Sequence, residues 1–343
     1  MGITRFLALG LILAFSFSGI DLPGVDTEAR VEISARPIAG FDLSDSSRRR
    51  FGDLEFRGGL ILTSSSPSFG GLSALYIQKD GSRFVALTDR GSWLRGRIVY
   101  EGKRPAAIAD AVMAPMLNTD GKAVGRLDAE SMTADRGKIF VGVERQHEIL
   151  GYDYGKKGFL APGKLVAAPP GIKDLPNNQG LEALVFIPKK LPLGGTLVAF
   201  SEQGLNEAGD LKAFLIGGPS PGTFWIKRTA DYDISDATLL PQGDLLILER
   251  KYSLQTGVAI RIRRVRLADI RPGVTVDGPT VLEADKHFAV DNAEAMGVHR
   301  TPAGETVLTL LSDDNFSRAQ RTLLLQFTLV GDGASTPHSA VRR

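Results

Sequence analysis

Acidic residues recur along this chain at the two ends of a repeated pattern of apolar stretches. Each of five copies begins with an acidic or polar residue, continues through an apolar stretch, a turn with Gly and a second apolar stretch, and closes with an acid. The acids at these places are Asp89, Glu130, Glu144, Glu182, Glu202, Asp236, Glu249, Glu294 and Asp313. Carboxylates that gather in one place repel one another, so they need a metal cation, a basic side chain or a proton to compensate them.

The ligand types favour a hard cation. The chain has no Cys and four His, and oxygen ligands bind Ca²⁺, or less well here Mg²⁺, in preference to zinc. We predict that part of the acidic set binds Ca²⁺, with ligands drawn from Asp89, Glu130, Glu182, Glu202, Asp236, Glu294 and Asp313. A structural role is the alternative, because acids also cap strands, accept backbone N–H groups and join neighbouring repeats.

Position within the repeat divides the acids into two groups. Glu130, Glu182 and Glu294 each open a first apolar stretch, so we expect them to point together toward one place. The acids that close a second stretch form the other group: Glu144, Glu202, Glu249 and Asp313. Arg145 and Arg250 directly follow two members of the second group, which favours salt bridges between repeats for these acids.

The elements that must position the acids are hairpins. A turn with Gly between two apolar stretches predicts a β-hairpin, and a hairpin brings the acids before and after it to the same end. The five hairpins begin near residues 72, 130, 182, 236 and 294, a little over 50 residues apart. This period predicts an all-β chain folded as a single β-propeller, with the acids around one mouth of its channel.

The number of blades stays open at five or six. Weaker strand-like runs at residues 97–100, 149–152, 213–216 and 258–265 are expected to be outer strands. One clear strand, at residues 323–329, follows the fifth hairpin, so segments 31–33 and 54–62 are expected to complete that blade and close the ring. Five hairpins predict five blades, whereas the length divided by the repeat predicts nearer six, with a degenerate hairpin between residues 30 and 65.

Residues 1–20 resemble an export signal, with Arg5 followed by an apolar run at residues 6–17 that is short for a membrane span. We therefore expect residues 21–335 to form one propeller domain in the bacterial periplasm or outside the cell, with 336–343 as a basic tail. The balance of 41 Lys plus Arg against 39 Asp plus Glu indicates no affinity for nucleic acid. We expect a monomer without stable membrane insertion.

Most catalytic motifs are missing from the sequence. It contains no Gly-x-Ser-x-Gly, no His-Glu-x-x-His, no phosphate-loop motif and no dinucleotide fingerprint. His147 lies just beyond Glu144 and is the best general acid or base among the four His.

Five short phrases together resemble a known family. They are DAESM at 128–132, NQGLEA at 178–183, LILER at 246–250, DNAEAM at 291–296 and LSDDNF at 311–316. They are similar to the phytase-like family of exported bacterial proteins described as having esterase-like activity of phytase, over about residues 60–330. The resemblance implies a propeller whose recurrent acids hydrolyse phosphoesters.

Two functions follow as hypotheses. The first is a metal-dependent phosphoester hydrolase acting on a phosphorylated small molecule or phosphodiester, with Glu130, Glu182 and Glu294 as catalytic acids. Basic residues would bind the phosphate oxygens in that enzyme: Arg145 and Arg250 foremost, with Arg90 and Lys251. The second is a non-catalytic, calcium-stabilised propeller of the cell envelope that binds a ligand or partner at the same mouth.

Overall fold

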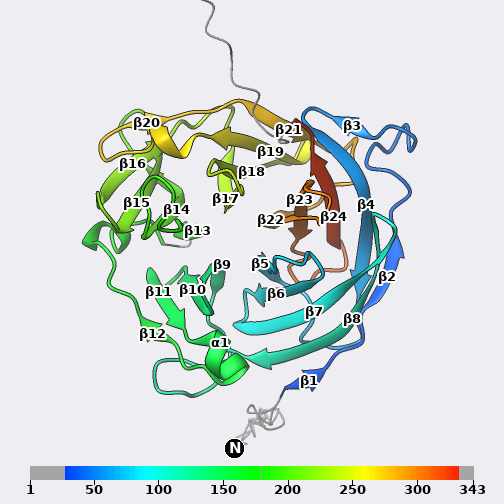
Figure 1. Cartoon of the computed structure of the whole chain (residues 1–343), viewed down its shortest axis with the longest axis horizontal. Helices are drawn as coiled ribbons and strands as arrows, with labels where there is room; N and C mark the ends of the chain where they lie inside the picture. Colours follow the sequence, from blue (N-terminus) through cyan, green and yellow to red (C-terminus); the bar gives the residue numbers. More distant parts are fainter. Residues whose placement is uncertain (1–27, 178, 332–343) are drawn as a thin grey trace, which may run out of the picture.

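The computed structural model describes residues 28–177 and 179–331, and within them the chain is an all-β propeller. Figure 1 looks down the central axis and shows five sheets arranged as blades, with β5, β9, β13, β17 and β22 nearest the centre. The described residues form five blades, so the lower of the two expected counts is correct. The signal-like residues 1–20 and the tail 336–343 lie outside the described residues.

In each of the first three blades, the four innermost strands follow the chain from inside to outside. The first contains β5 (Leu72–Ile77), β6 (Arg83–Thr88), β7 (Ser92–Glu101), β8 (Arg104–Pro115) and β1 (Ala29–Arg30). The second contains β9 (Ala129–Asp135), β10 (Lys138–Val143), β11 (Glu148–Tyr152) and β12 (Lys164–Leu165). The third contains β13 (Leu181–Phe186), β14 (Thr196–Leu205), β15 (Leu211–Gly217), β16 (Gly222–Ile226) and β20 (Thr275–Val276). Each expected hairpin is therefore present as the two innermost strands of a blade.

The last two blades complete the array. The fourth contains β17 (Asp233–Leu239), β18 (Leu245–Ser253), β19 (Gly257–Val265) and β21 (Thr280–Ala284). The fifth contains β22 (Ala293–Arg300), β23 (Thr306–Ser312), β24 (Thr322–Leu329), β4 (Leu54–Thr63) and β2 (Ser34–Pro37), while β3 (Arg50–Phe51) pairs with β4. The short helices are α1 (Tyr154–Lys157) and three 3₁₀ turns at Gly158–Leu160, Pro170–Ile172 and Leu267–Asp269.

The fifth blade joins the two ends of the described chain. β24 lies antiparallel to β4, with Leu329 opposite Leu54 and Thr322 opposite Leu62. This is the pairing of N-terminal and C-terminal strands that the sequence predicts. Segment 31–33 differs from the expectation, because it is not a strand and connects β1 in the first blade to β2 in the fifth.

The hydrophobic core is divided among the spaces between neighbouring blades. Five buried apolar clusters fill these spaces, including one between the fourth and fifth blades and one between the fifth and first. Both faces of the inner strands are therefore covered, and β23, for example, is buried along its whole length. Packing on both faces fixes the strand ends from which the mouth residues project.

Among the described residues, we find no helix whose length and apolar character would let it cross a membrane.

Candidate active site

Every innermost strand carries a β-bulge at the same place. The pairing with the second strand skips one residue in each blade, as between Ala293 and Ala295 of β22. The skipped residues are Ser73, Glu130, Glu182, Ser235 and Glu294. A bulge re-aims the side chain of its extra residue, and bulges are frequent beside active sites. The three glutamates expected to share one position in the repeat therefore do share it.

The two bulges that carry Ser serve the architecture. The Ser73 hydroxyl donates a hydrogen bond to the backbone carbonyl of Ala129 in the next blade, at 2.5 Å. Ser235 donates in the same way to Ala293, at 3.0 Å. A short hydroxyl thus joins blade to blade at this position, which shows that the fold does not need a carboxylate there.

The residues at or just past the end of the pairing between the two inner strands of each blade form a further ring. The backbone N–H groups of Asp89, Glu144, Glu202 and Asp313 donate to the residue that precedes each inner strand, at 2.8 to 3.0 Å. In the fourth blade this place belongs to Arg250, which pairs with Asp233. Grouping Glu249 with the mouth acids is therefore wrong by one residue. Because strand side chains alternate between faces, that one step places Glu249 on the opposite face from Arg250.

Two overlapping triads of carboxylates lie at the mouth. Ligand atoms of Asp128, Glu130 and Glu144 lie within 4.8 Å of one another, and so do those of Glu144, Glu182 and Glu202. Glu144 belongs to both triads. All donors are carboxylate oxygens, the ligand type that Ca²⁺ prefers, and Mg²⁺ binds with stricter geometry. The residues present therefore fit one or two hard cations.

Burial raises the pKa of the mouth carboxyls. Glu130 and Glu182 have pKa values well above the usual range, first because they are desolvated and then because neighbouring carboxylates repel a further negative charge. The pKa of Glu202 is raised to about 7, mainly by burial, and that of Asp313 also to about 7 for the same reason. Glu182 also hydrogen-bonds to Glu144. These carboxyls retain protons that a bound cation would displace.

Arg250 connects three blades at the mouth. Its guanidinium donates to Glu294 at 2.5 Å and to Asn292, both from the fifth blade, and contacts Glu202 of the third blade at 3.5 Å. Asn292 in turn donates to Glu294 at 2.7 Å. The predicted pairing between blades is present here for Glu202, whereas the sequence does not predict the contact of Arg250 with Glu294.

A pocket of about 920 Å³ opens beside this arginine. Glu202 and Arg250 lie in its lining, together with Asn292, so the pocket adjoins the second triad. A ligand in the pocket would meet a carboxyl with a pKa near neutrality and a guanidinium held in place by two acids. Such an arrangement can bind an anion and exchange a proton with it or with water.

Two other expected ligands, Asp236 and Asp313, accept backbone N–H groups, whereas a third, Asp89, has a buried carboxylate oxygen without a hydrogen-bond partner. The carboxylate of Asp236 accepts backbone N–H groups from Ala237 at 2.7 Å and from Met296 at 2.6 Å, so it holds β22 against β17. Asp313 accepts the N–H of Asn315 at 2.6 Å. Burial raises the pKa of Asp89, and the nearby charges of Arg90 and Arg126 lower it again in part.

The expected phosphate-binding residues are divided between the mouth and its rim. Arg145 pairs with Asp128 at 2.8 Å and stays half exposed, on the side of the first triad. The Arg90 guanidinium lies over the ring of Phe316, 3.4 Å from its centroid. Lys251 lies over the Tyr232 ring at 4.4 Å and lines the pocket. Arg250 is thus the predicted cation that is directly bound to mouth acids and also lines the pocket.

His147 lies beside Glu144, the acid that the two triads share. Its backbone N–H donates to the carbonyl of Glu144 at 2.9 Å, and its buried Nδ1 lies against Gly180. A side chain at Gly180 would collide with both Glu144 and His147. The glycine therefore allows these two residues to approach the start of β13.

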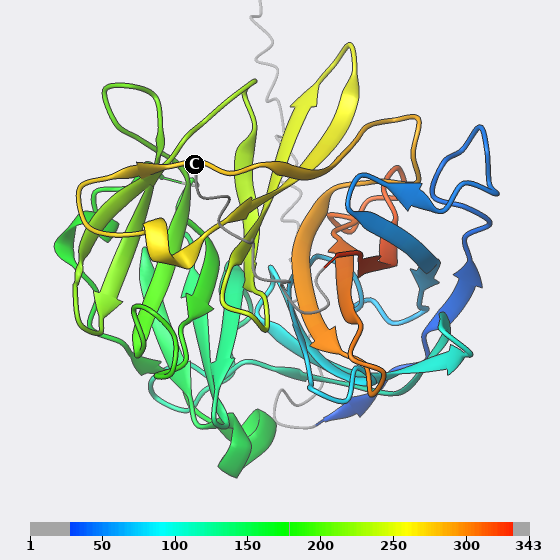
Figure 2. The ribbon, with the colours of Figure 1, turned by 45° about the horizontal axis from the view of Figure 1, so that its top comes forward.

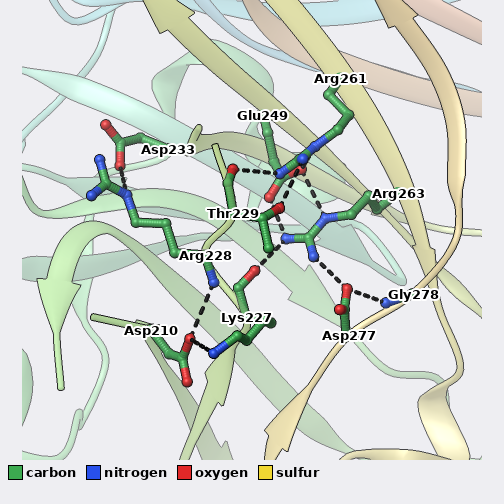
Figure 3. Close-up of polar contacts among 10 residues, drawn as sticks. All are labelled: Asp210, Lys227, Arg228, Thr229, Asp233, Glu249, Arg261, Arg263, Asp277 and Gly278. Carbon is green, nitrogen blue, oxygen red and sulfur yellow. Dashed lines mark hydrogen bonds and ion pairs between the residues drawn. The ribbon is translucent and has the colours of Figure 1, made fainter. Parts of the chain in front are cut away.

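Glu249 belongs to a buried ion-pair cluster outside the mouth. It accepts hydrogen bonds from Arg261 at 2.7 Å and Arg263 at 2.9 Å on the neighbouring strand β19, as Figure 3 shows. Arg263 also binds Asp277 at 2.6 Å. The expected structural role of Glu249 fits this position, but its partners are these two arginines and not Arg250.

Asp128 and Glu144 are absent from the ligand set that the sequence predicts, although both lie in the triads. A polar residue two positions before the bulged residue, as at Asp128, Asp233 and Asn292, is the signal that could identify the first. Glu144 could be identified because it has the same place in its repeat as Glu202. Each lies two residues after the last regular pair of the two inner strands, before the register shifts at the bulge.

The comparisons with known proteins give one family. A family model described as phytase-like, esterase-like activity of phytase, matches residues 67–316. No curated protein matches the chain. Among solved structures, a chain of an S. cerevisiae complex described as a Dbp5 variant bound to Nup159, a Gle1 variant, IP6 and ADP is similar at 12% identity and a TM-score of 0.38. The alignment covers 82% of this chain and 96% of that one.

Proposed function

Because the chain belongs to the phytase-like family, we propose that its acidic mouth hydrolyses phosphoric esters, monoesters or diesters, with the help of bound Ca²⁺. The observation that carries this proposal is the position of the two triads, which share Glu144, while the second of them adjoins a pocket that contains Arg250. An esterase for phosphate needs a cation site and a fixed anion-binding donor side by side, and the mouth offers both.

A bound divalent cation would neutralise charge on the phosphoryl oxygens. The chain's own residues would supply the other parts. Arg250 donates N–H groups to an ester phosphate, and Glu294 and Asn292 orient its guanidinium. Glu202 belongs to the second triad and also lines the pocket, and its pKa of about 7 suits a group that accepts a proton from water at neutral pH.

The proposal is tested by hydrolysis of a generic phosphomonoester and phosphodiester after chelation, with and without added Ca²⁺. Calcium-dependent turnover that a chelator abolishes supports it. Calcium binding without turnover of either ester would favour the other hypothesis, a calcium-stabilised binding propeller.

We propose in addition that the protein is exported, because residues 1–20 have the pattern of a secretory signal. Mass spectrometry of the native protein from a periplasmic fraction should then find a chain that lacks these residues. An intact N-terminus in the cytoplasmic fraction would contradict export.

Calcium is expected to stabilise the fold, and more so at higher pH. The mouth carboxyls with raised pKa values hold protons in the folded, metal-free protein that the unfolded chain releases near pH 4.5. Their contribution to stability is therefore full below about pH 4.5 and is lost as the pH rises through the raised pKa values, about 7 for Glu202, when the carboxylates charge and repel. Calcium binds the charged form, so it should raise Tm by roughly 5 °C at pH 8 and by less at pH 5.5.

Differential scanning fluorimetry in a chelator and in millimolar-range CaCl₂, at several pH values, measures this difference. The same concentration of MgCl₂ is the control and should give a smaller shift. An equal Tm in chelator and calcium at pH 8 would remove the cation from the proposed mechanism.

A further inference from the structure

A projecting hairpin forms one wall of the pocket beside Arg250. It consists of the ends of β18 and β19, and in Figure 2 it rises as a yellow hairpin above the neighbouring blades. Arg250 and Tyr252 are two residues apart on β18, so they project from the same face about 7 Å apart. Val258 lies directly opposite Tyr252 on β19. The wall therefore presents a cation at its base and an apolar surface above it.

The apolar part of this wall is open to solvent. Tyr252 is 66% exposed, and Val258 and Ala319 line the same pocket. Leu254, at the tip of the same hairpin, is 92% exposed but does not line the pocket. An exposed aromatic ring at the edge of a pocket offers a flat apolar surface on which a ligand group can stack.

The charges of the lining do not suit a polyanion. Three cationic side chains, Arg228, Arg250 and Lys251, face four acidic ones, Glu202, Asp231, Asp233 and Asp291. Arg228 is already paired with Asp233 at 2.9 Å. Cations held by the second triad would lie at Glu202, where they would neutralise one phosphoryl group and leave the other acids of the lining, Asp231, Asp233 and Asp291, without a bound cation. Several phosphates in one ligand would meet repulsion there.

We propose that this pocket takes esters in which a single phosphoryl group is joined to an aromatic or similarly flat apolar group, in preference to polyphosphorylated molecules. The position of the phosphoryl group at Arg250 rests on the proposed function. The apolar end stacks on Tyr252, which makes Tyr252 a specificity-determining residue.

The experiment compares phenyl phosphate, methyl phosphate and myo-inositol hexakisphosphate as substrates of the full chain with calcium. We expect the highest kcat/KM for phenyl phosphate. Tyr252→Ala should raise the KM for phenyl phosphate about tenfold, the range of one lost aromatic stack, and Tyr252→Phe should retain the parent KM. The KM for methyl phosphate should change less than about twofold in Tyr252→Ala. Leu254→Ala, on the same hairpin outside the pocket, is the matched control and should behave like the parent.

A second measurement keeps this inference separate from catalysis. Calorimetric binding of phenylphosphonate and methylphosphonate needs no turnover, and tighter binding of phenylphosphonate should disappear in Tyr252→Ala. If no ester is hydrolysed but this difference is found, the proposed function fails and the pocket assignment stands. A higher kcat/KM for the hexakisphosphate, or Tyr252→Ala with parental KM and phenylphosphonate affinity, overturns the pocket assignment whether or not the protein is an esterase.

Discussion

Replacing Glu182 with Gln is expected to reduce calcium-dependent ester hydrolysis by at least about a hundredfold, the usual effect of removing one group that stabilises the transition state. Glu182 shares a triad with Glu144 and Glu202. Gln keeps the size of the side chain but offers a neutral ligand where the cation needs a charged one. Calcium affinity, measured by calorimetry, should fall with the turnover.

The fold should survive this change. Burial and the neighbouring carboxylates raise the pKa of Glu182 well above its usual range, which favours the neutral form in the metal-free protein, and Gln resembles that form. In chelator at pH 8, the Tm of Glu182→Gln should equal or exceed that of the parent, because the variant cannot acquire the unfavourable charge. A purely structural role for Glu182 would instead lower this Tm.

The variant Glu294→Gln should distinguish the contribution of the metal site from that of the anion-binding Arg250. Glu294 binds Arg250 at 2.5 Å and lies outside both triads. Loss of its charge should therefore weaken the hold on Arg250 and reduce turnover mainly through KM, with a smaller effect on calcium affinity than Glu182→Gln. Glu305→Gln, in the turn between β22 and β23, is the control for removing an acid elsewhere. If both mouth variants bind calcium and process ester like the parent, the site is misplaced and the recurrent acids are architectural.

The repeat of hairpins could be predicted from the sequence because two apolar stretches joined by a turn with Gly are compatible with few local structures other than a β-hairpin. The inner strands begin where expected, at Leu72, Ala129, Leu181, Asp233 and Ala293. The shared position of Glu130, Glu182 and Glu294 was equally accessible, since it depends on counting from the same strand in each repeat. Local patterns suffice for both.

The partners of the acids could not be predicted, because they depend on register. A bulge adds one residue to each inner strand, and one residue decides whether a side chain faces the mouth or the interior of the blade. Glu249 and Arg250 are adjacent in sequence, yet one is buried among arginines and the other lies at the mouth. Asp236 looks like a ligand in sequence, but one of its oxygens accepts the N–H of the adjacent Ala237 and the other accepts that of Met296, which only the folded neighbour, β22, brings near.

Replacing Glu249 with Gln is expected to lower the free energy of unfolding by about 3–5 kcal/mol, the usual cost of breaking a buried ion pair on one side. Glu249 is fully buried, and Arg261 and Arg263 are 7% and 2% exposed. Both guanidinium groups donate to its carboxylate, and Figure 3 shows how they converge on it. With Gln, Arg261 would lose its anionic partner, and the amide NH₂ would face groups that are themselves donors.

Thermal unfolding in the presence and absence of calcium measures this loss of stability and distinguishes it from the effects of the mouth variants. The Tm of Glu249→Gln should fall by roughly 10 °C, while the increase produced by calcium stays as in the parent, because Glu249 lies outside both triads. Asp277→Asn is the matched control: its carboxylate binds the same Arg263 but is 59% exposed, so its loss should cost less than about 1 kcal/mol. A Tm for Glu249→Gln within about 2 °C of the parent, or a lost response to calcium, would contradict the structural role. The first result would mean that water or another anion reaches the two arginines, because a buried carboxylate between them is otherwise indispensable.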